Sequence, residues 1–165
     1  MDARALQLLQ GVEHVPHAGD IGDDGVIKEL ASIAPVTAVR GNVDREGPTS
    51  LYPTEVTLAL AGYRIFLTHE VKPPKREADF ALEQYRQAGV EVVVYGHSHI
   101  PYQQLWGDIL FFNPGAAGKR RFKVILSIGF LTLPPAGVEG TITPLEAAAG
   151  PGLPVTPPPS RSSGR

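Results

Sequence analysis

The sequence predicts an α/β protein with mixed sheets, and three patterns favour this class. Near the amino end, short helical patterns alternate with apolar strands, as in a βαβ unit. In the middle, two β-rich runs are separated by Ala61-Gly62, which is the length of a hairpin turn. Farther on, residues 90–95 form an almost continuous apolar run, as expected for a strand that is buried on both faces.

The amino-terminal half is expected to alternate helix and strand. Gly11 ends the first helical pattern, and Asp23 or Asp24 can cap the second helix, which stops before Pro35. Pro16 lies within a short strand and removes a backbone donor there, which indicates an edge or a distorted strand. The predicted elements are a helix over residues 5–9, a strand over 14–17, a helix from about 24, and a strand over 36–39.

The second half is expected to contain more strands than helices. The β-rich runs and their turns predict strands over residues 55–60, 63–68, 90–95, 102–106 and 109–112, a helix over about 77–88, and two further strands that end near Pro144. Residues 1–146 are therefore expected to form one domain. Residues 147–165 are rich in proline, serine and glycine and have too little apolar surface to offset the entropy of ordering, so this tail is expected to be disordered.

Composition excludes several kinds of partner. The formal net charge of the 165 residues is −2, which gives no basic field for a long nucleic acid or an anionic membrane surface. No run is apolar and long enough for a membrane helix, and the first residues lack the pattern of a signal peptide. Cysteine is absent, so histidine and carboxylate side chains would have to bind any metal. We expect a cytoplasmic protein with a small substrate, and a homodimer stays open.

Metal-competent side chains follow four of the predicted strands. They are Asp20, Asn42, His69, and the pair His97 and His99. Each follows a glycine or a small polar residue, and strand ends of an α/β sheet converge on one crevice. Taken singly, Gly-Asp and Gly-Asn are more often turns, and an isolated histidine is more often structural. His17 could orient Asp20 or be a plain strand-end histidine. The combination of five residues predicts a metal site.

These motifs resemble those of the calcineurin-like metallophosphoesterases, and in particular their YfcE-type phosphodiesterase branch. The matching segments occur in the family's order over residues 2 to about 144, and they are Gly19-Asp20, Gly41-Asn42-Val43-Asp44, Thr68-His69, Gly96-His97-Ser98-His99 and Asn113-Pro114-Gly115. The resemblance implies a four-layer α/β/β/α sandwich with a centre of two divalent metal ions.

The resemblance also implies a role for each matched residue. Asp20 would bridge both ions, Asn42, His69 and His97 would complete the ligands of one ion, and His99 would serve the other. Asp20, Asn42 and His97 would be the catalytic residues. The mixture of carboxylate, amide and imidazole suits manganese first, and also iron, nickel, cobalt or zinc, better than calcium or copper.

One family motif has no counterpart in this sequence. The family's first strand ends in Asp-x-His, which supplies two ligands to the ion that His99 shares. The resemblance therefore implies an N-terminally truncated domain whose first strand is missing, with a second ion held by Asp20 and His99 alone. Two protein ligands make a poor site, so the chain as given could be inactive. An internal start of translation and a degenerate family member are the two explanations.

The implied activity is hydrolysis of a phosphodiester by a metal-activated water, with phosphomonoesters as the neighbouring substrate class. Larger relatives have a histidine after the asparagine ligand that can protonate the leaving group, and this sequence has Val43 there. Substrates with good leaving groups are therefore favoured. The main alternative is a non-catalytic scaffold, for which a retromer subunit of the same fold is a precedent. A purely structural metal-binding domain is a weaker third interpretation.

Overall fold

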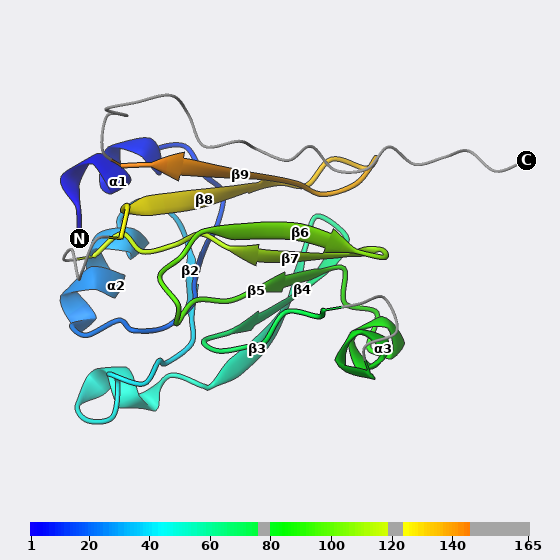
Figure 1. Cartoon of the computed structure of the whole chain (residues 1–165). Coiled ribbons are helices and arrows are strands. Elements are labelled where there is room, and N and C mark those ends of the chain that lie inside the picture. The colour runs from blue at the N-terminus through cyan, green and yellow to red at the C-terminus, as the bar shows by residue number, and fades with distance from the viewer. Residues whose placement is uncertain (76–79, 119–123, 146–165) are drawn as a thin grey trace, which may run out of the picture.

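The computed structural model describes residues 1–75, 80–118 and 124–145 of the chain. Its elements alternate as the sequence predicts (Figure 1). In chain order they are α1 (Ala3–Leu8), β1 (Val15–His17), α2 (Asp24–Ala31), β2 (Val36–Ala38), the short helix η1 (Pro48–Leu51), β3 (Glu55–Leu60), β4 (Tyr63–Thr68), α3 (Phe80–Gln87), β5 (Val92–Val94), β6 (Tyr102–Trp106), β7 (Ile109–Asn113), β8 (Ser127–Thr132) and β9 (Glu139–Pro144).

The strands form one large sheet and two small ones. The large sheet has the order β3-β4-β5-β7-β6, in which β4, β5 and β7 are parallel while β3 and β6 pair antiparallel at the edges. The parallel pair β1-β2 and the antiparallel pair β8-β9 are separate two-stranded sheets. The predicted α/β class with mixed sheets is confirmed.

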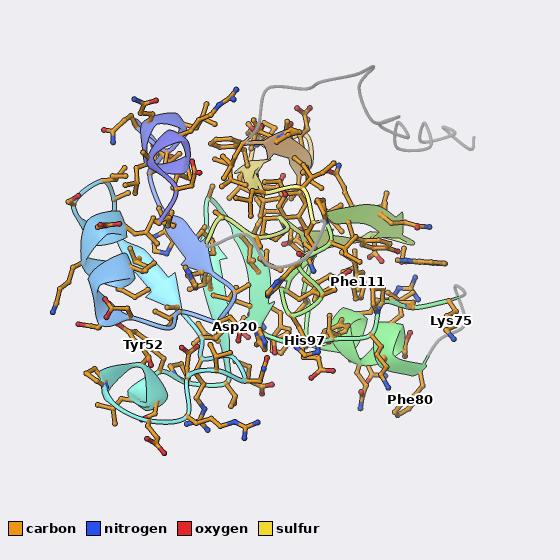
Figure 2. All side chains as sticks on the ribbon, turned by 60° about the vertical axis from the view of Figure 1, so that its left-hand side comes forward. Asp20, Tyr52, Lys75, Phe80, His97 and Phe111 are labelled. Carbon is orange, nitrogen blue, oxygen red and sulfur yellow. The ribbon has the colours of Figure 1, made fainter. Side chains whose placement is uncertain are left out.

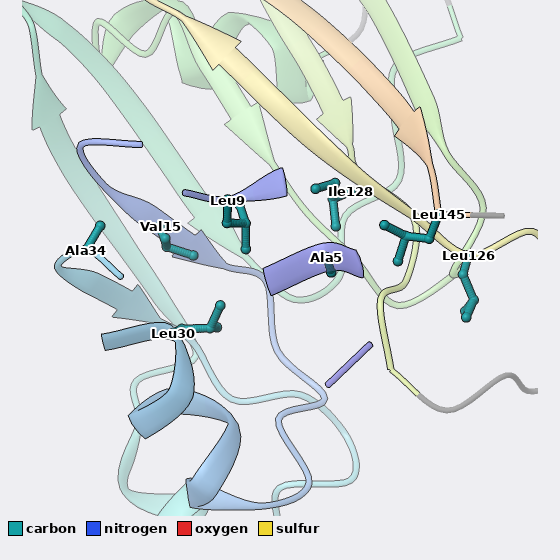
Figure 3. Close-up of a cluster of buried hydrophobic side chains, with 8 residues drawn as sticks. All are labelled: Ala5, Leu9, Val15, Leu30, Ala34, Leu126, Ile128 and Leu145. Carbon is teal, nitrogen blue, oxygen red and sulfur yellow. The ribbon is translucent and has the colours of Figure 1, made fainter. Parts of the chain in front are cut away.

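Three apolar clusters separate the layers. Leu30 of α2 and Ala5 of α1 pack with Val15 of β1 and Ile128 of β8 in the outer cluster (Figure 3). The middle cluster joins alternate side chains of the large sheet to the small sheets, and the third buries Leu82 of α3 against the opposite face of the large sheet. The order is therefore helices, the two small sheets, the large sheet and α3, which agrees with the four layers that the resemblance implied.

Local signals explain most element boundaries. Asp23 is the cap of α2, and its side chain accepts a hydrogen bond from the Gly25 N–H at 2.7 Å. The hairpin β3-β4 turns at Ala61 and Gly62, both with positive φ, as a two-residue turn requires. β5 is shorter than the predicted strand over residues 90–95, and η1 was not predicted. The predicted start of α3 and the predicted tail over 147–165 lie outside the described residues.

Each of the two small sheets has an open edge in the described part of the chain. In the described part of the chain, β1 pairs only with β2 and β8 pairs only with β9, so each has one edge without a neighbouring strand. Pro16 lies in the middle of β1, which agrees with its prediction as an edge. None of the described helices is long and apolar enough to cross a membrane.

Candidate metal centre

The five predicted ligands lie in loops that follow the carboxyl ends of strands. Asp20 follows β1, Asn42 follows β2, His69 directly follows β4, and the loop after β5 carries His97 and His99. Figure 2 labels Asp20 and His97, which come from different layers of the sandwich and lie in its central region. The distances between their side-chain atoms place all five side chains together, so the structure brings every predicted ligand to one site. Their individual roles stay predictions.

Four of the side chains form one compact group of donor atoms. His69 Nε2 lies 2.9 Å from Asn42 Oδ1, 3.3 Å from His97 Nδ1 and 3.4 Å from Asp20 Oδ1. His97 Nδ1 lies 3.3 Å from Asn42 Oδ1. Ligands of one ion at bonds of about 2.1 Å are separated by about 3.0 Å in an octahedral site and about 3.4 Å in a tetrahedral one. The observed spacings match the edges of such a polyhedron.

The hydrogen bond of His69 Nδ1 leaves Nε2 available as a metal ligand. Its Nδ1 lies 2.8 Å from the carbonyl oxygen of Ala18, which can only accept, so Nδ1 carries the proton. Nε2 of the neutral ring then has a free lone pair. In that form Nε2 faces the oxygen atoms of Asn42 and Asp20, and a cation among these three donor atoms would stabilise the arrangement. The donor set therefore fits a divalent metal ion.

Backbone strain is concentrated in the same loops. Within the described ranges, four non-glycine residues have positive φ, and three of them are Asp20 (55°), His97 (63°) and His99 (57°). Such conformations cost about 1–3 kcal/mol each for residues with a Cβ and cluster at functional sites. Glycines beside them allow close approach: a Cβ on Gly19 would lie 2.6 Å from His69 Nδ1, and one on Gly41 would overlap the Asp20 carboxylate. The loops are thus shaped to bring donors together.

Asp44 ties two of these loops to each other. Its side chain is 1% exposed and accepts backbone N–H groups from Gly41 at 2.7 Å, Gly22 at 2.8 Å and Ile21 at 3.0 Å. Burial by itself would raise the pKa of Asp44, but these three donors outweigh it and hold the pKa below its ordinary value. The ionised carboxylate therefore fixes the loop after β1 to the loop after β2. Asp44 belongs to the Gly41-Asn42-Val43-Asp44 motif, but its sequence context predicts no role for it.

We expect Asp44→Asn to lower the free energy of unfolding by about 2–3 kcal/mol, because an amide NH₂ group would face backbone N–H donors in a buried site. Urea unfolding followed by circular dichroism measures this loss. Asp108→Asn is the matched control, since the exposed Asp108 makes one surface ion pair with Arg86 at 3.1 Å and should change stability by less than about 1 kcal/mol. Equal losses in the two variants would contradict the bracing role.

The fifth predicted ligand stands on the other side of Asp20. His99 Nε2 lies 3.4 Å from Asp20 Oδ2, whereas His69 contacts the other oxygen of this carboxylate, Oδ1. Over residues 1–75, 80–118 and 124–145, no three His, Cys, Asp or Glu side chains are grouped to hold a metal by themselves. One ion therefore needs the Asn42 amide as well, and a second would have only Asp20 and His99 from the described residues.

Other polar residues support the loop after β5. Asn113 is fully buried at the end of β7 and donates to the Gly96 carbonyl at 2.8 Å and to Ser98 Oγ at 3.2 Å.

Glu70, which was not predicted from the sequence, lies 3.7 Å from His97 Nε2. Its position directly after His69 is the sequence feature from which Glu70 could have been found. Within the described residues, the buried Nδ1 of His17 has no hydrogen-bond partner, so the structure does not show His17 orienting Asp20. Burial lowers the pKa of His17, opposed by the charges of Asp44 and Asp20.

Comparisons with known proteins agree with this geometry. The family model for the calcineurin-like phosphoesterase superfamily domain matches residues 1–134. A probable metallophosphoesterase of Methanothermobacter thermautotrophicus is 30% identical over 108 residues, which cover 66% of this chain and 62% of that protein. The phosphodiesterase YfcE of Escherichia coli K12 is 38% identical over 87 residues, which cover 49% of this chain and 44% of YfcE. The matches thus span about half to three fifths of these relatives.

The fold also has solved counterparts. Vps29 from Entamoeba histolytica, in a crystal structure complexed with zinc, superposes with a TM-score of 0.65 at 18% sequence identity. The superposition covers 88% of this chain and 91% of that one. At this identity the likeness bears on the fold and leaves the activity open.

Proposed function

Because the chain belongs to the calcineurin-like phosphoesterase superfamily, we propose that it is a metal-dependent hydrolase of phosphodiesters, with phosphomonoesters as the neighbouring substrate class. Family membership implies divalent metal ions. The observation that carries the proposal is the convergence of Asp20, Asn42, His69 and His97 at spacings of 2.9–3.4 Å, with the free lone pair of His69 directed at the other donors.

The donors would hold the ion in a rigid frame. Ala18 orients the His69 ring, and the Val43 N–H donates to Asp20 Oδ1 at 3.3 Å, so the ligand orientations depend on backbone groups. When bound, divalent ions would polarise the phosphoryl oxygens and lower the pKa of a water, so that hydroxide is available near neutral pH. The loops of this chain would then serve to position the phosphoester beside the donors.

The substrate is expected to have a good leaving group. Val43 follows Asn42 at the site, is 39% exposed and cannot donate a proton. A leaving group that departs without protonation is therefore favoured. The slightly negative net charge favours a small phosphoester over a long polyanion. We propose manganese as the first metal to test, since the donors combine carboxylate, amide and imidazole.

The direct test is hydrolysis of an activated aryl phosphodiester by the chain after removal of all metal. We expect turnover to require added Mn²⁺ or another divalent transition metal and to disappear in excess chelator. A parallel assay on the aryl phosphomonoester separates the two substrate classes.

Two outcomes would overturn the proposal. Full turnover in excess chelator would remove the metal requirement. Stoichiometric metal binding without turnover of either ester would favour a non-catalytic scaffold built on the same fold.

A further inference from the structure

The two nitrogen atoms of the His97 ring have different surroundings. Nδ1 lies 3.3 Å from Asn42 Oδ1 and 3.3 Å from His69 Nε2, within the group of donor atoms. Nε2 lies 3.7 Å from Oε1 of Glu70, a side chain to which the proposed function assigns no part. Nδ1 is therefore the nitrogen that faces a metal ion, and Nε2 is the nitrogen that is left for a supporting partner.

The backbone places Glu70 beside His97. The strands β4 and β5 are parallel neighbours, so the loops that follow them leave the sheet side by side. The Gly96 N–H donates to the His69 carbonyl at 3.0 Å, which ties the residue before His97 to the residue before Glu70. The rings of His69 and His97 meet edge to face, with their centroids 5.2 Å apart. The contact between Glu70 and His97 therefore follows from the pairing of the two strands.

Both histidines of the donor group have an acceptor at their second nitrogen. For His69 this acceptor is the Ala18 carbonyl, which lies 2.8 Å from Nδ1. For His97, the acceptor that the described chain offers at Nε2 is Glu70. Histidines that bind metals almost always donate their other N–H to a carboxylate, a carbonyl or water, and this bond fixes the ring. Glu70 thus has the same position relative to His97 as the Ala18 carbonyl has to His69.

A partner at Nε2 decides which nitrogen of His97 is free to bind a metal. If the neutral ring carried its proton on Nδ1, that N–H would point at Asn42 Oδ1 and no lone pair would face the site. A proton on Nε2 leaves the Nδ1 lone pair free. The His97 side chain is 44% exposed, so water can also accept from Nε2, but a carboxylate is the stronger acceptor.

We infer that Glu70 is a positioning residue of the metal centre, whose carboxylate accepts the Nε2–H of His97 and holds the Nδ1 lone pair toward Asn42 and His69. The two atoms are at ion-pair distance, and rotation of the exposed Glu70 side chain brings them to a hydrogen bond of about 2.9 Å. The value of this bond for metal binding rests on the proposed function, whereas the bond itself can be tested without metal.

The first test is isothermal titration of Glu70→Ala and Glu70→Gln with Mn²⁺. We expect Glu70→Ala to lower the affinity by about tenfold, the usual loss when the support of a ligand is removed. Glu70→Gln should stay within about threefold of the unaltered chain, because its amide oxygen still accepts the Nε2–H. The control is Glu139→Ala, which removes the same charge from an exposed side chain at the start of β9 and should change nothing.

The second test needs no metal. Long-range proton–nitrogen NMR spectra of the histidine rings show which nitrogen of His97 carries the proton, and about pH 8.5 keeps an ordinary histidine neutral. We expect the proton on Nε2 in the unaltered chain and in Glu70→Gln. In Glu70→Ala the population should shift toward the form with the proton on Nδ1. Thermal unfolding of each variant confirms that it is folded.

The outcomes separate this inference from the proposed function. Unchanged Mn²⁺ affinity in Glu70→Ala overturns the inference. An equal loss in Glu70→Gln overturns it too, because the effect would then come from charge alone. A His97 ring with its proton on Nδ1 in the unaltered metal-free chain also overturns it. If the unaltered chain binds no Mn²⁺, the proposed function fails, and the ring spectra alone decide whether Glu70 positions His97.

Discussion

Asp20→Asn is expected to lower metal affinity by at least about 100-fold, the largest effect of any single substitution at the site. In the described chain, the Asp20 carboxylate contacts His69 through Oδ1 and His99 through Oδ2, so it joins the two sides of the site. Removing even an indirect support of a ligand typically costs about 10–100-fold in affinity, and this change removes the negative charge as well. Phosphodiester hydrolysis should fall by at least about 1000-fold, which corresponds to about 4 kcal/mol.

Isothermal titration with Mn²⁺ measures the affinity, and the matched control is Asp24→Asn. Asp24 undergoes the same chemical change four residues away, where it weakens an ion pair with Lys28 at 2.9 Å and a side-chain hydrogen bond with Tyr52, both away from the donor group. We expect the control to bind and hydrolyse as the unaltered chain does. If Asp20→Asn kept its metal affinity, the assignment of Asp20 as a ligand would be wrong.

The second large effect separates the two histidines that contact Asp20. His69→Ala should lower the affinity for metal by about 100-fold or more, since His69 Nε2 faces three of the other donor atoms. His99→Ala should change the metal content of this chain little, because among the predicted ligands in the described residues His99 is paired with Asp20 Oδ2 alone. Metal per chain by elemental analysis compares the two variants, and thermal unfolding of each confirms that it is folded.

An equal loss of metal in the two histidine variants would contradict this division of ligands. The division also predicts a different result for a chain to which the family's Asp-x-His motif is added ahead of Met1. In that chain His99→Ala should become costly, whereas the effect of His69→Ala should stay the same.

Local sequence patterns were sufficient to predict the β3-β4 hairpin and the start of α2. The hairpin of β3 and β4 was predicted residue for residue, because a two-residue turn fixes the register of both strands. The Asp23 cap likewise placed the start of α2. The five candidate ligands could be found because each stands in the loop that follows a strand, and the sandwich brings those strand ends together.

Contacts between distant segments were not predictable in the same way. Asp44 looked like any loop carboxylate, and its bracing role appears only when the loops after β1 and β2 lie side by side. β5 is shorter than its apolar run, since Val90 bonds instead to the end of α3 through the Tyr85 carbonyl.

The central claim is that these loops form a metal centre, and the most direct test is anomalous diffraction from crystals grown with Mn²⁺. We predict one strong peak within about 2.0–2.3 Å of Asp20, Asn42, His69 and His97, with any peak between Asp20 and His99 weaker. Crystals of the Asp20→Asn variant should lack both. Crystals in which the protein is well ordered but no anomalous peak lies among these four side chains would contradict the account. A peak that persists in the variant would contradict it as well.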